Sequence, residues 1–208
     1  MIMPKIVTTT AILLLFLEHA AFGQNSFFPK SFSASFTQIL KSELNGKEKK
    51  SYGTIEYRYP GSIRVEIESP DPLTFVRNEH NSWYYTPPFI EGEAGQVTLN
   101  SGNKFGLTAF FDVLNLGLLS NDRYTVVTKP DSVQLVFSAK FAKEMDIKSA
   151  TISFQHNIMH DFVDTDTIEI TRVGGKKSKL ILSKIIKNPK LSDERFIFRI
   201  PPNTRTTR

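Results

Sequence analysis

The stretch TIEYRYPGSIRVEIESP, residues 54–70, indicates that the chain folds around an antiparallel sheet. Apolar and polar side chains alternate from Ile55 to Tyr59 and again from Ile63 to Ile67, which is the period of a β-strand with one face toward a core. Pro60-Gly61 separates the two runs, as expected of a tight turn. We therefore expect two antiparallel strands with one buried face and one solvent-facing face.

Strand-like runs continue toward the C-terminus. Residues 73–77 and 82–86 are expected to form a hairpin, and Pro87-Pro88 should end it before an exposed loop at 89–95. Further strands are predicted at 124–128, 133–139, 147–155, 162–170, 179–186 and 195–200. Gly174-Gly175 is typical of a hairpin turn. The sum predicts an α+β fold in which one long antiparallel sheet curls around helical cover.

Two segments have helical spacing. In residues 29–45, Phe32 and Phe36 start an apolar stripe that continues through Ile39, Leu40 and Leu44. In residues 104–118 the stripe contains Leu107, Phe110, Phe111, Leu114 and Leu118. We expect an amphipathic helix at each place, with its apolar face against the sheet.

The N-terminus has the features of a secretory signal peptide. Lys5 precedes an apolar run at residues 6–17, and Ala21-Phe22-Gly23 is a small-x-small cleavage site. The run is shorter than the roughly 20 residues that a membrane span needs. We expect cleavage after residue 23 and a single exported domain at residues 24–208.

Composition narrows the class of function. The chain has no cysteine, which excludes disulfides, thiol catalysis and lipid attachment at a cysteine, and is compatible with the bacterial periplasm. The net charge of +5 is not clustered with stacking aromatics, so nucleic-acid binding is not expected. Lys176, Lys177 and Lys179 gather at one turn, which favours a solvated surface, with docking to an anionic membrane or an acidic partner as the alternative.

Catalytic and metal motifs are not found. The segment HNIMHDFVDTD places His156 and His160 four residues apart, followed by Asp161, Asp164 and Asp166. Among strand-like runs, residues four apart lie roughly 13 Å from each other, too far to share an ion. Glu66 and Glu68 fall on the polar strand face. We expect no enzyme, no metal and no cofactor.

Several motifs together resemble the LolA family of periplasmic lipoprotein carriers. They are SFSASFTQ at 31–38, Gly53 at the first strand, YPGSIRVEIESP at 59–70, WYYTPPF at 83–89 and FRIPP at 198–202. Their order and spacing cover nearly all of the mature chain. The resemblance implies an incomplete antiparallel β-barrel, closed by helices, around an apolar cavity for lipoprotein acyl chains.

The resemblance also implies partners and site residues. An inner-membrane ABC-type transporter would release acylated lipoproteins to this carrier, and an outer-membrane acceptor like LolB would receive them. The carrier would be a monomer in the periplasm. Cavity and lid are expected to comprise Phe32, Phe36, Ile63, Val65, Ile67, Phe75, Trp83, Phe110, Phe111 and Leu114.

One position departs from the family pattern. Where the family has a basic residue before the turn proline, implicated in closing the lid, this chain has Tyr59. Arg58 would point to the opposite strand face and cannot take its place. Tyr59 is therefore the candidate lid latch. Asn78-Glu79 stands where the family has an Asp-Gly turn, which indicates a different turn type.

Other functions remain open at the level of sequence. The same fold could serve a periplasmic lipid or lipoprotein sensor or a specialised lipid-binding protein. A secreted lipid hydrolase would need a nucleophile and a base that the motifs do not supply. Finally, apolar periodicity does not separate a fillable cavity from a solid core, so a purely structural envelope protein would show the same pattern.

Overall fold

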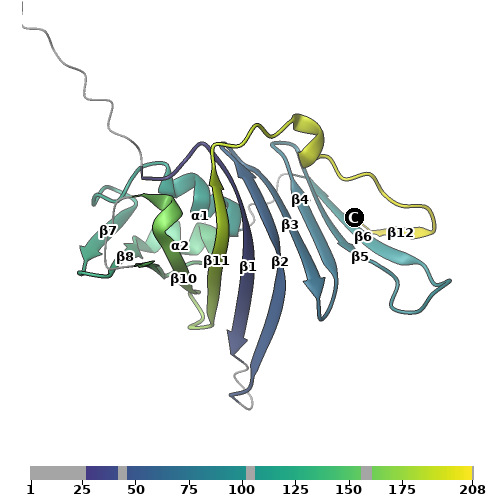
Figure 1. Cartoon of the computed structure of the whole chain (residues 1–208), viewed down its shortest axis with the longest axis horizontal. Coiled ribbons are helices and arrows are strands. Elements are labelled where there is room, and N and C mark those ends of the chain that lie inside the picture. Colours follow the sequence, from purple (N-terminus) through teal and green to yellow (C-terminus); the bar gives the residue numbers. More distant parts are fainter. Residues whose placement is uncertain (1–26, 42–45, 102–105, 156–160, 208) are drawn as a thin grey trace, which may run out of the picture.

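The computed structural model describes residues 27–41, 46–101, 106–155 and 161–207 (Figure 1). The expected signal peptide lies outside them. Within the described residues, twelve strands form one sheet in the order β12-β6-β5-β4-β3-β2-β1-β11-β10-β9-β8-β7. Strand β12 runs parallel to β6, and the other neighbouring pairs are antiparallel. The two outermost strands do not pair with each other, so the sheet stays open.

The elements follow one another in chain order. The strands are β1 Ser31–Lys41, β2 Glu48–Arg58, β3 Ser62–Ser69, β4 Leu73–Arg77, β5 Asn81–Thr86, β6 Gly95–Ser101, β7 Tyr124–Thr128, β8 Ser132–Phe137, β9 Ser149–Phe154, β10 Thr165–Thr171, β11 Lys177–Lys187 and β12 Thr204–Thr207. The α-helices are α1 Gly106–Leu114 and α2 Ala139–Met145, and the 3-10 helices are η2 Phe162–Asp164 and η3 Asp193–Phe196.

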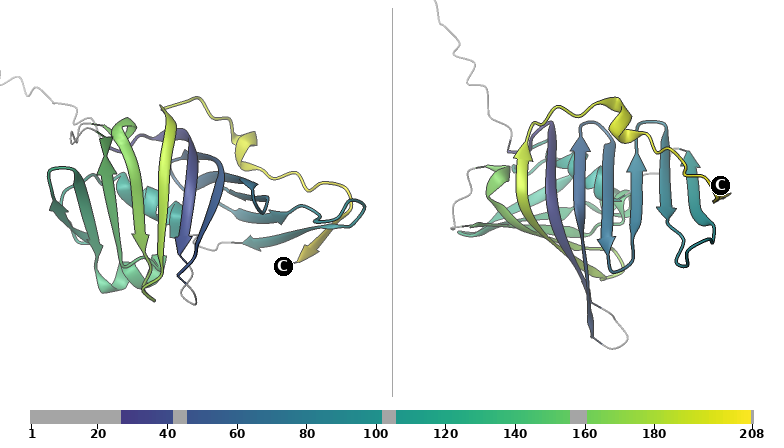
Figure 2. Two further views of the ribbon diagram at one scale, coloured as in Figure 1. Left: turned by 60° about the horizontal axis from the view of Figure 1, so that its bottom comes forward. Right: turned by 45° about the vertical axis from the view of Figure 1, so that its right-hand side comes forward.

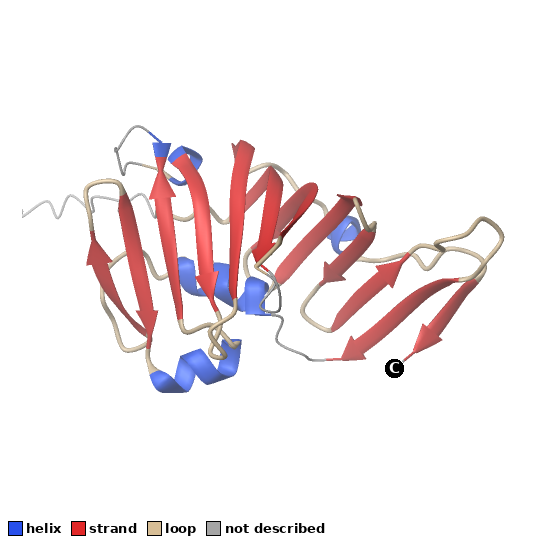
Figure 3. Cartoon of the chain, turned by 90° about the horizontal axis from the view of Figure 1, so that it is seen from below, coloured by secondary structure: helices blue, strands red, loops and turns tan. Residues whose placement is uncertain are grey.

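The sheet curls around one of its helices. Strands β7 to β11 and β1 to β3 bend around α1, whereas β5, β6 and β12 extend outward as a flatter wing (Figure 2). Seen from below, α1 lies within the curl and α2 lies at the ends of the curled strands (Figure 3). This arrangement confirms the expected α+β fold with a half-open antiparallel barrel.

The segment expected as the first helix is instead strand β1, and the helix prediction was wrong. Phe32, Ala34 and Phe36 are buried while Ser33 and Ser35 between them are partly exposed. Residues four apart share a face in a strand as well as in a helix, so Phe32 and Phe36 fit both periods. Pairing decides the outcome, because β1 lies between β2 and β11 and bonds to both.

The remaining elements follow the prediction with local differences. Helix α1 and the strands up to β11 are confirmed in type, with ends shifted by a few residues, although η2 occupies the start of the run expected at 162–170. The strand expected at 195–200 is wrong, since η3 and irregular chain occupy it. Strands β6 and β12 and the short helix α2 were not predicted. The Gly174-Gly175 turn is confirmed, with Gly175 at φ +86° joining β10 to β11.

The apolar face of the sheet changes side along its width. In the curled part the buried side chains point inward around α1 and form the main core. Where β4 meets the wing, Val76 packs with Trp83 of β5 and Val97 of β6 in a second buried cluster. Trp83 lies opposite Val76 and Leu99, one residue out of step with Phe75 and Tyr84, so this cluster is on the outer face.

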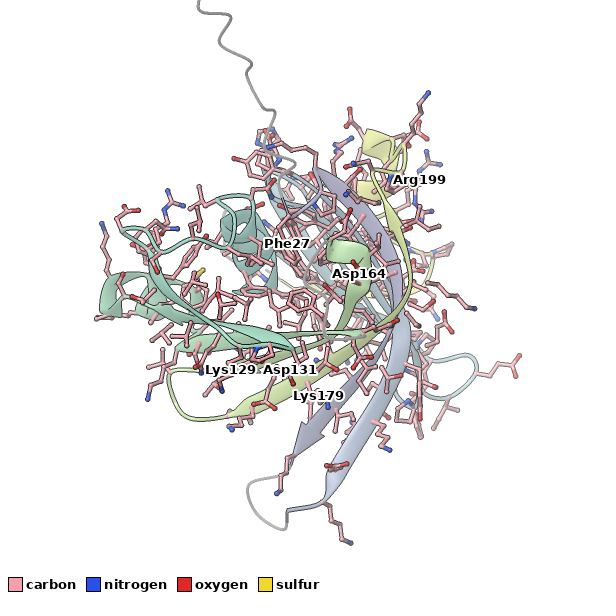
Figure 4. The ribbon with its side chains drawn as sticks, turned by 60° about the vertical axis from the view of Figure 1, so that its left-hand side comes forward. Phe27, Lys129, Asp131, Asp164, Lys179 and Arg199 are labelled. Atoms are coloured by element: carbon pink, nitrogen blue, oxygen red, sulfur yellow. The ribbon has the colours of Figure 1, made fainter. Side chains whose placement is uncertain are left out.

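The C-terminal segment covers that outer face. The Arg195 guanidinium donates to both Glu56 carboxylate oxygens, at 2.8 and 2.9 Å, and this hydrogen bond raises the pKa of Arg195. The Phe198 ring lies 5.1 Å from the Tyr85 ring. Figure 4 labels Arg199 on this segment, outside the curl, and Phe27 within the curl. The wing is therefore held by its own small core rather than by the main one.

Candidate functional site: an apolar cavity under helix α1

An apolar cavity lies between the curled sheet and the start of helix α1. Its volume is about 230 Å³. Apart from Gln38 its lining is apolar or aromatic, and it comprises Phe36, Gln38, Ile55, Val65, Ile67, Leu73, Phe75, Tyr84, Leu107, Leu180 and Leu182. The site is thus an apolar cavity whose lining includes one side-chain amide, that of Gln38.

Sheet register brings the lining residues together. Phe36 of β1 pairs with Leu182 of β11 on one side and with Gly53 of β2 on the other. Val65 of β3 stands opposite Ile55 and Phe75. These inward positions come from alternating residues on neighbouring strands, which is how a pleated sheet presents one continuous face. Gly53 contributes no side chain to that face, because the backbone of Glu66 occupies the place where its Cβ would lie.

The core is filled at the other end of the curl. Phe28, Phe32, Tyr57, Phe111 and Phe162 form a ring cluster in which centroids lie 4.8–5.6 Å apart. All five side chains are at most 1% exposed. Contacts at this distance in edge and tilted geometries are the favoured packing of aromatic rings. The ring cluster closes one end of the space in which the cavity lies.

The expected site residues therefore divide into two groups. Phe36, Val65, Ile67 and Phe75 line the cavity together. Phe32, Ile63, Phe110, Phe111 and Leu114 are fully buried and pack in the main core without lining it. Phe32 and Phe36 belong to the wall of the sheet, not to a lid helix as expected. Trp83 lies in the outer cluster of the wing, on the face away from the cavity.

Seven lining residues were not predicted as site residues: Gln38, Ile55, Leu73, Tyr84, Leu107, Leu180 and Leu182. Two of them could have been predicted from the sequence. Ile55 occupies an apolar position of an alternating strand, as Val65 and Ile67 do, and Leu107 begins the apolar stripe of α1. Leu180 and Leu182 could be assigned only once β11 was known to pair with β1, a contact between residues far apart in sequence. Strand pairing order is the information that the local pattern does not contain.

The roof helix is fixed at its C-terminal end by Asp112. Its carboxylate accepts a 2.7 Å hydrogen bond from the Tyr57 hydroxyl and a 2.9 Å bond from the backbone N–H of Gly61. Burial raises the pKa of Tyr57 far above its ordinary value, and the nearby Asp112 charge raises it further. Tyr57 is therefore a neutral donor at any physiological pH.

Tyr59 does not make this connection. Its ring is exposed and lies 4.3 Å from the Lys30 ammonium, and its backbone N–H donates to the Lys30 carbonyl oxygen. The contact between the β2–β3 turn and α1 comes instead from Gly61, two residues later, and from Tyr57, two residues earlier. Two features of the sequence point to this contact: Tyr57 occupies an inward position of its strand, and the helix expected to cover the sheet contains Asp112.

Metal chemistry has no support in the described residues. No group of three or more His, Asp or Glu side chains among residues 27–41, 46–101, 106–155 and 161–207 could hold a metal ion. His156 and His160 lie outside these ranges. Asp161 instead caps η2 and accepts a hydrogen bond from Lys187. In the same described part, no helix combines the length and apolarity needed to cross a membrane.

Comparison with known proteins identifies relatives along most of the chain. The family model described as outer membrane lipoprotein carrier protein LolA matches residues 29–199. An outer-membrane lipoprotein carrier protein of Dechloromonas aromatica is 28% identical over 207 residues, covering 96% of this chain and 94% of its own. One of Idiomarina loihiensis is 26% identical over 175 residues, covering 83% of this chain and 78% of its own.

Solved structures include distant neighbours. A LolA superfamily protein from Nitrosomonas europaea aligns with a TM-score of 0.47 at 11% identity, covering 83% of this chain and 93% of its own. The family match spans β1 through the segment after η3, and so includes every strand and helix residue that lines the cavity. The chain belongs to the LolA family.

Proposed function

We propose that this protein is a periplasmic carrier that shelters the acyl chains of lipoproteins between the inner and outer membranes. The observation that carries the proposal is the apolar cavity between the sheet and α1 in a chain of the LolA family. The cleaved chain, residues 24–208, would act as one domain. It would take its cargo from a transporter of the inner membrane and give it to an acceptor at the outer membrane.

The physical need for such a carrier is large. Each methylene exposed to water costs about 0.8 kcal/mol, so a 16-carbon chain left in the aqueous periplasm costs on the order of 12 kcal/mol. Burial against Phe36, Val65 and Phe75 removes that cost without any covalent chemistry. Transfer to the acceptor then needs only that the acceptor binds the chains more tightly.

The cavity must widen to receive cargo. Its volume of about 230 Å³ lies below the roughly 300–1,000 Å³ typical of ligand pockets. The ring cluster is tightly packed, whereas the start of α1 contributes only Leu107 to the cavity. Movement of this end of the roof helix away from the sheet is the least costly way to enlarge the space.

In this proposal the fixed hinge point of the roof helix is Asp112, and Tyr59 has no part in it. Asp112 ties the far end of α1 to Tyr57 and to the turn at Gly61, so the helix would hinge there while its Leu107 end opens. Asn115 adds a 3.3 Å hydrogen bond to the Tyr57 hydroxyl from the residue just beyond the helix. A closed carrier and an open one would then differ mainly in the position of Leu107.

The proposal is tested by release of lipoprotein from membranes. The purified chain 24–208 is mixed with inner-membrane vesicles that contain an acylated lipoprotein and its releasing transporter, with and without ATP. The proposal expects a soluble one-to-one complex of carrier and lipoprotein that forms only with ATP. Lipoprotein that stays on the vesicles, with folded carrier present, would overturn it.

A further inference from the structure

A second pocket adjoins the apolar cavity at the end of strands β1 and β11. Its volume is about 630 Å³. It is lined by Gln38, Leu40, Lys41, Asp146, Arg172, Gly174, Lys176, Lys177 and Ser178. Four of these side chains are basic and one is acidic. We call it the basic pocket.

The two spaces lie next to each other along the same strands. Gln38 lines both of them. On the inward face of the β1–β11 pair, Phe36 opposite Leu182 is followed by Gln38 opposite Leu180 and then by Leu40 opposite Ser178. Residues two apart on a strand are separated by roughly 7 Å. The inward face thus leads from the cavity to the basic pocket within two rungs of the ladder. There the pocket is lined by Lys41 and Lys177 at the strand ends and by Arg172 and Lys176 of the β10–β11 turn.

The positive charge of the basic pocket is only partly neutralised. The Arg172 guanidinium donates a 2.7 Å hydrogen bond to the Asp146 carboxylate, which leaves most of its five N–H donors for other acceptors. Lys177 lies 3.6 Å from Glu169, outside the pocket. Lys41 and Lys176 form no ion pair with another described residue. The pocket is therefore prepared for an anion with several acceptor oxygens.

An apolar cavity beside a cationic pocket fits one ligand class. In an anionic phospholipid the phosphate is joined to the glycerol that also bears the acyl chains, so both groups must be bound within a short distance. The four basic side chains of the pocket are exposed and would also meet a membrane surface. Only a single lipid also enters the adjoining apolar cavity, which shares Gln38 with the pocket and is reached along the inward side of the sheet. The geometry favours a single bound lipid.

We propose that the basic pocket binds the phosphate headgroup of an anionic phospholipid whose acyl chains enter the apolar cavity. This inference rests on the proposed function, because it uses the same cavity, and it adds a second class of cargo. Lys41 and Lys176 supply the unpaired charges, and Arg172 supplies directional donors. Because the pocket is open, its affinity should fall as salt rises.

Uptake of phosphatidylglycerol tests the proposal. The chain 24–208 is incubated with vesicles of phosphatidylcholine that do or do not contain phosphatidylglycerol, separated from them by gel filtration, and its bound lipid is quantified by mass spectrometry. Wild type is expected to retain phosphatidylglycerol in preference to phosphatidylcholine. Lys41→Gln/Lys176→Gln should retain about fivefold less phosphatidylglycerol, the size expected for two exposed charge contacts, with phosphatidylcholine unchanged.

A matched pair of lysines on the same ladder provides the control. Lys50 of β2 and Lys179 of β11 both stand opposite Ile39, and neither lines the basic pocket. Lys50→Gln/Lys179→Gln removes the same charge and should retain phosphatidylglycerol as wild type does. Equal loss in both double variants would mean a general charge effect and would overturn the proposal, as would binding to anionic vesicles without lipid uptake.

Two further measurements distinguish failure of the phospholipid proposal from failure of the proposed carrier function. Glycerol 3-phosphate at millimolar concentration supplies the headgroup without chains; if it binds while phosphatidylglycerol is not retained, the pocket is a site for soluble anions and the lipid proposal is wrong. Lipoprotein release is measured on the same samples. A carrier that releases lipoprotein but retains no phospholipid overturns this inference alone, and one that does neither overturns the proposed function as well.

Discussion

The Tyr57 hydroxyl and the Asp112 carboxylate are joined by a 2.7 Å hydrogen bond that connects strand β2 to the roof helix. Tyr57 also packs in the ring cluster, with its ring 5.4 Å from that of Phe111. The same residue thus closes one end of the barrel and holds the helix above the cavity. A polar bond in a buried aromatic setting fixes one arrangement of the helix, because breaking it leaves a buried donor unpaired.

Replacing Asp112 with alanine should loosen the roof. The change leaves the Tyr57 hydroxyl and the Gly61 N–H without their acceptor, which should lower the free energy of unfolding by about 2–3 kcal/mol. Asp112→Asn keeps an acceptor oxygen and should cost less than about 1 kcal/mol. Urea denaturation measures both variants. Equal stability of Asp112→Ala and wild type would show that the bond does not hold the helix.

Gly53→Ala should prevent correct pairing of β2 with β3. A Cβ atom at Gly53 would lie 1.9 Å from the backbone oxygen of Glu66, and strand backbone does not yield cheaply at that distance. We expect a loss of more than about 3 kcal/mol, seen as a large drop in melting temperature or as failure to fold. Gly174→Ala is the control, because its Cβ would meet nothing within 4 Å and its φ is not positive. An unaffected Gly53→Ala protein would contradict the observed approach of the strands.

The contact of Lys187 with Asp161 should make stability depend on pH in the acid range. Burial raises the pKa of Asp161, but the hydrogen bond and positive charge of Lys187 outweigh it and hold the pKa below its ordinary value. Because the folded state then binds fewer protons than the unfolded state, the contribution is present above the unfolded pKa of about 3.9 and is lost as pH falls through the folded pKa.

Lys187→Gln measures that contribution. Both side chains are about one-third exposed, so the expected cost at pH 7 is only about 0.5–1 kcal/mol. The cost should shrink as pH falls through the lowered pKa of Asp161, because the protonated carboxyl no longer pairs with Lys187. Lys177→Gln, which removes a longer and more exposed contact with Glu169, should have a smaller effect. A difference between Lys187→Gln and wild type that does not shrink as the pH is lowered would argue against the ion pair.

Phe36→Glu should abolish binding of acyl chains. It places a carboxylate among Ile55, Val65 and Leu182, where burial of an unpaired charge is strongly unfavourable. Thr37→Glu is the matched control, since Thr37 is the next residue of β1 and points to the opposite face. Fluorescence of an acyl-chain probe reports binding, and circular dichroism reports folding. A folded Phe36→Glu protein that binds the probe as wild type does would exclude this cavity as the site.

Local alternation was enough to predict the strands between Thr54 and Thr86, because apolar residues recur at every second position and Pro, Gly or Asn occupies the turns between them. It failed at β1, where Phe32 and Phe36 share a face in either conformation and only pairing with β2 and β11 separates strand from helix. It also missed β12, whose four polar residues carry no pattern and are positioned by β6 alone.

Part of the site could be predicted from the alternation of apolar and polar residues. Phe36, Val65, Ile67 and Phe75 could be assigned inward from their parity, but parity does not tell a packed ring from a cavity wall. Phe32 and Phe36 differ only in their neighbours: Phe32 meets the rings of Phe28, Phe111 and Phe162, whereas Phe36 pairs with Gly53. The prediction that Trp83 lines the cavity is wrong. Its side chain is buried on the other face of the sheet, where the C-terminal segment at Phe198 covers it, and the local pattern does not contain this contact.

The central claim is that acyl chains lie in the cavity beneath α1, and photo-crosslinking locates them most directly. A lipoprotein whose acyl chains carry diazirine groups is bound to the chain 24–208, irradiated, and the modified residues are found by mass spectrometry. We predict modification at Phe36, Val65, Phe75 and Leu107. Modification confined to the outer cluster around Trp83 and Val97, or a bound lipoprotein whose chains modify no cavity residue, would contradict the account.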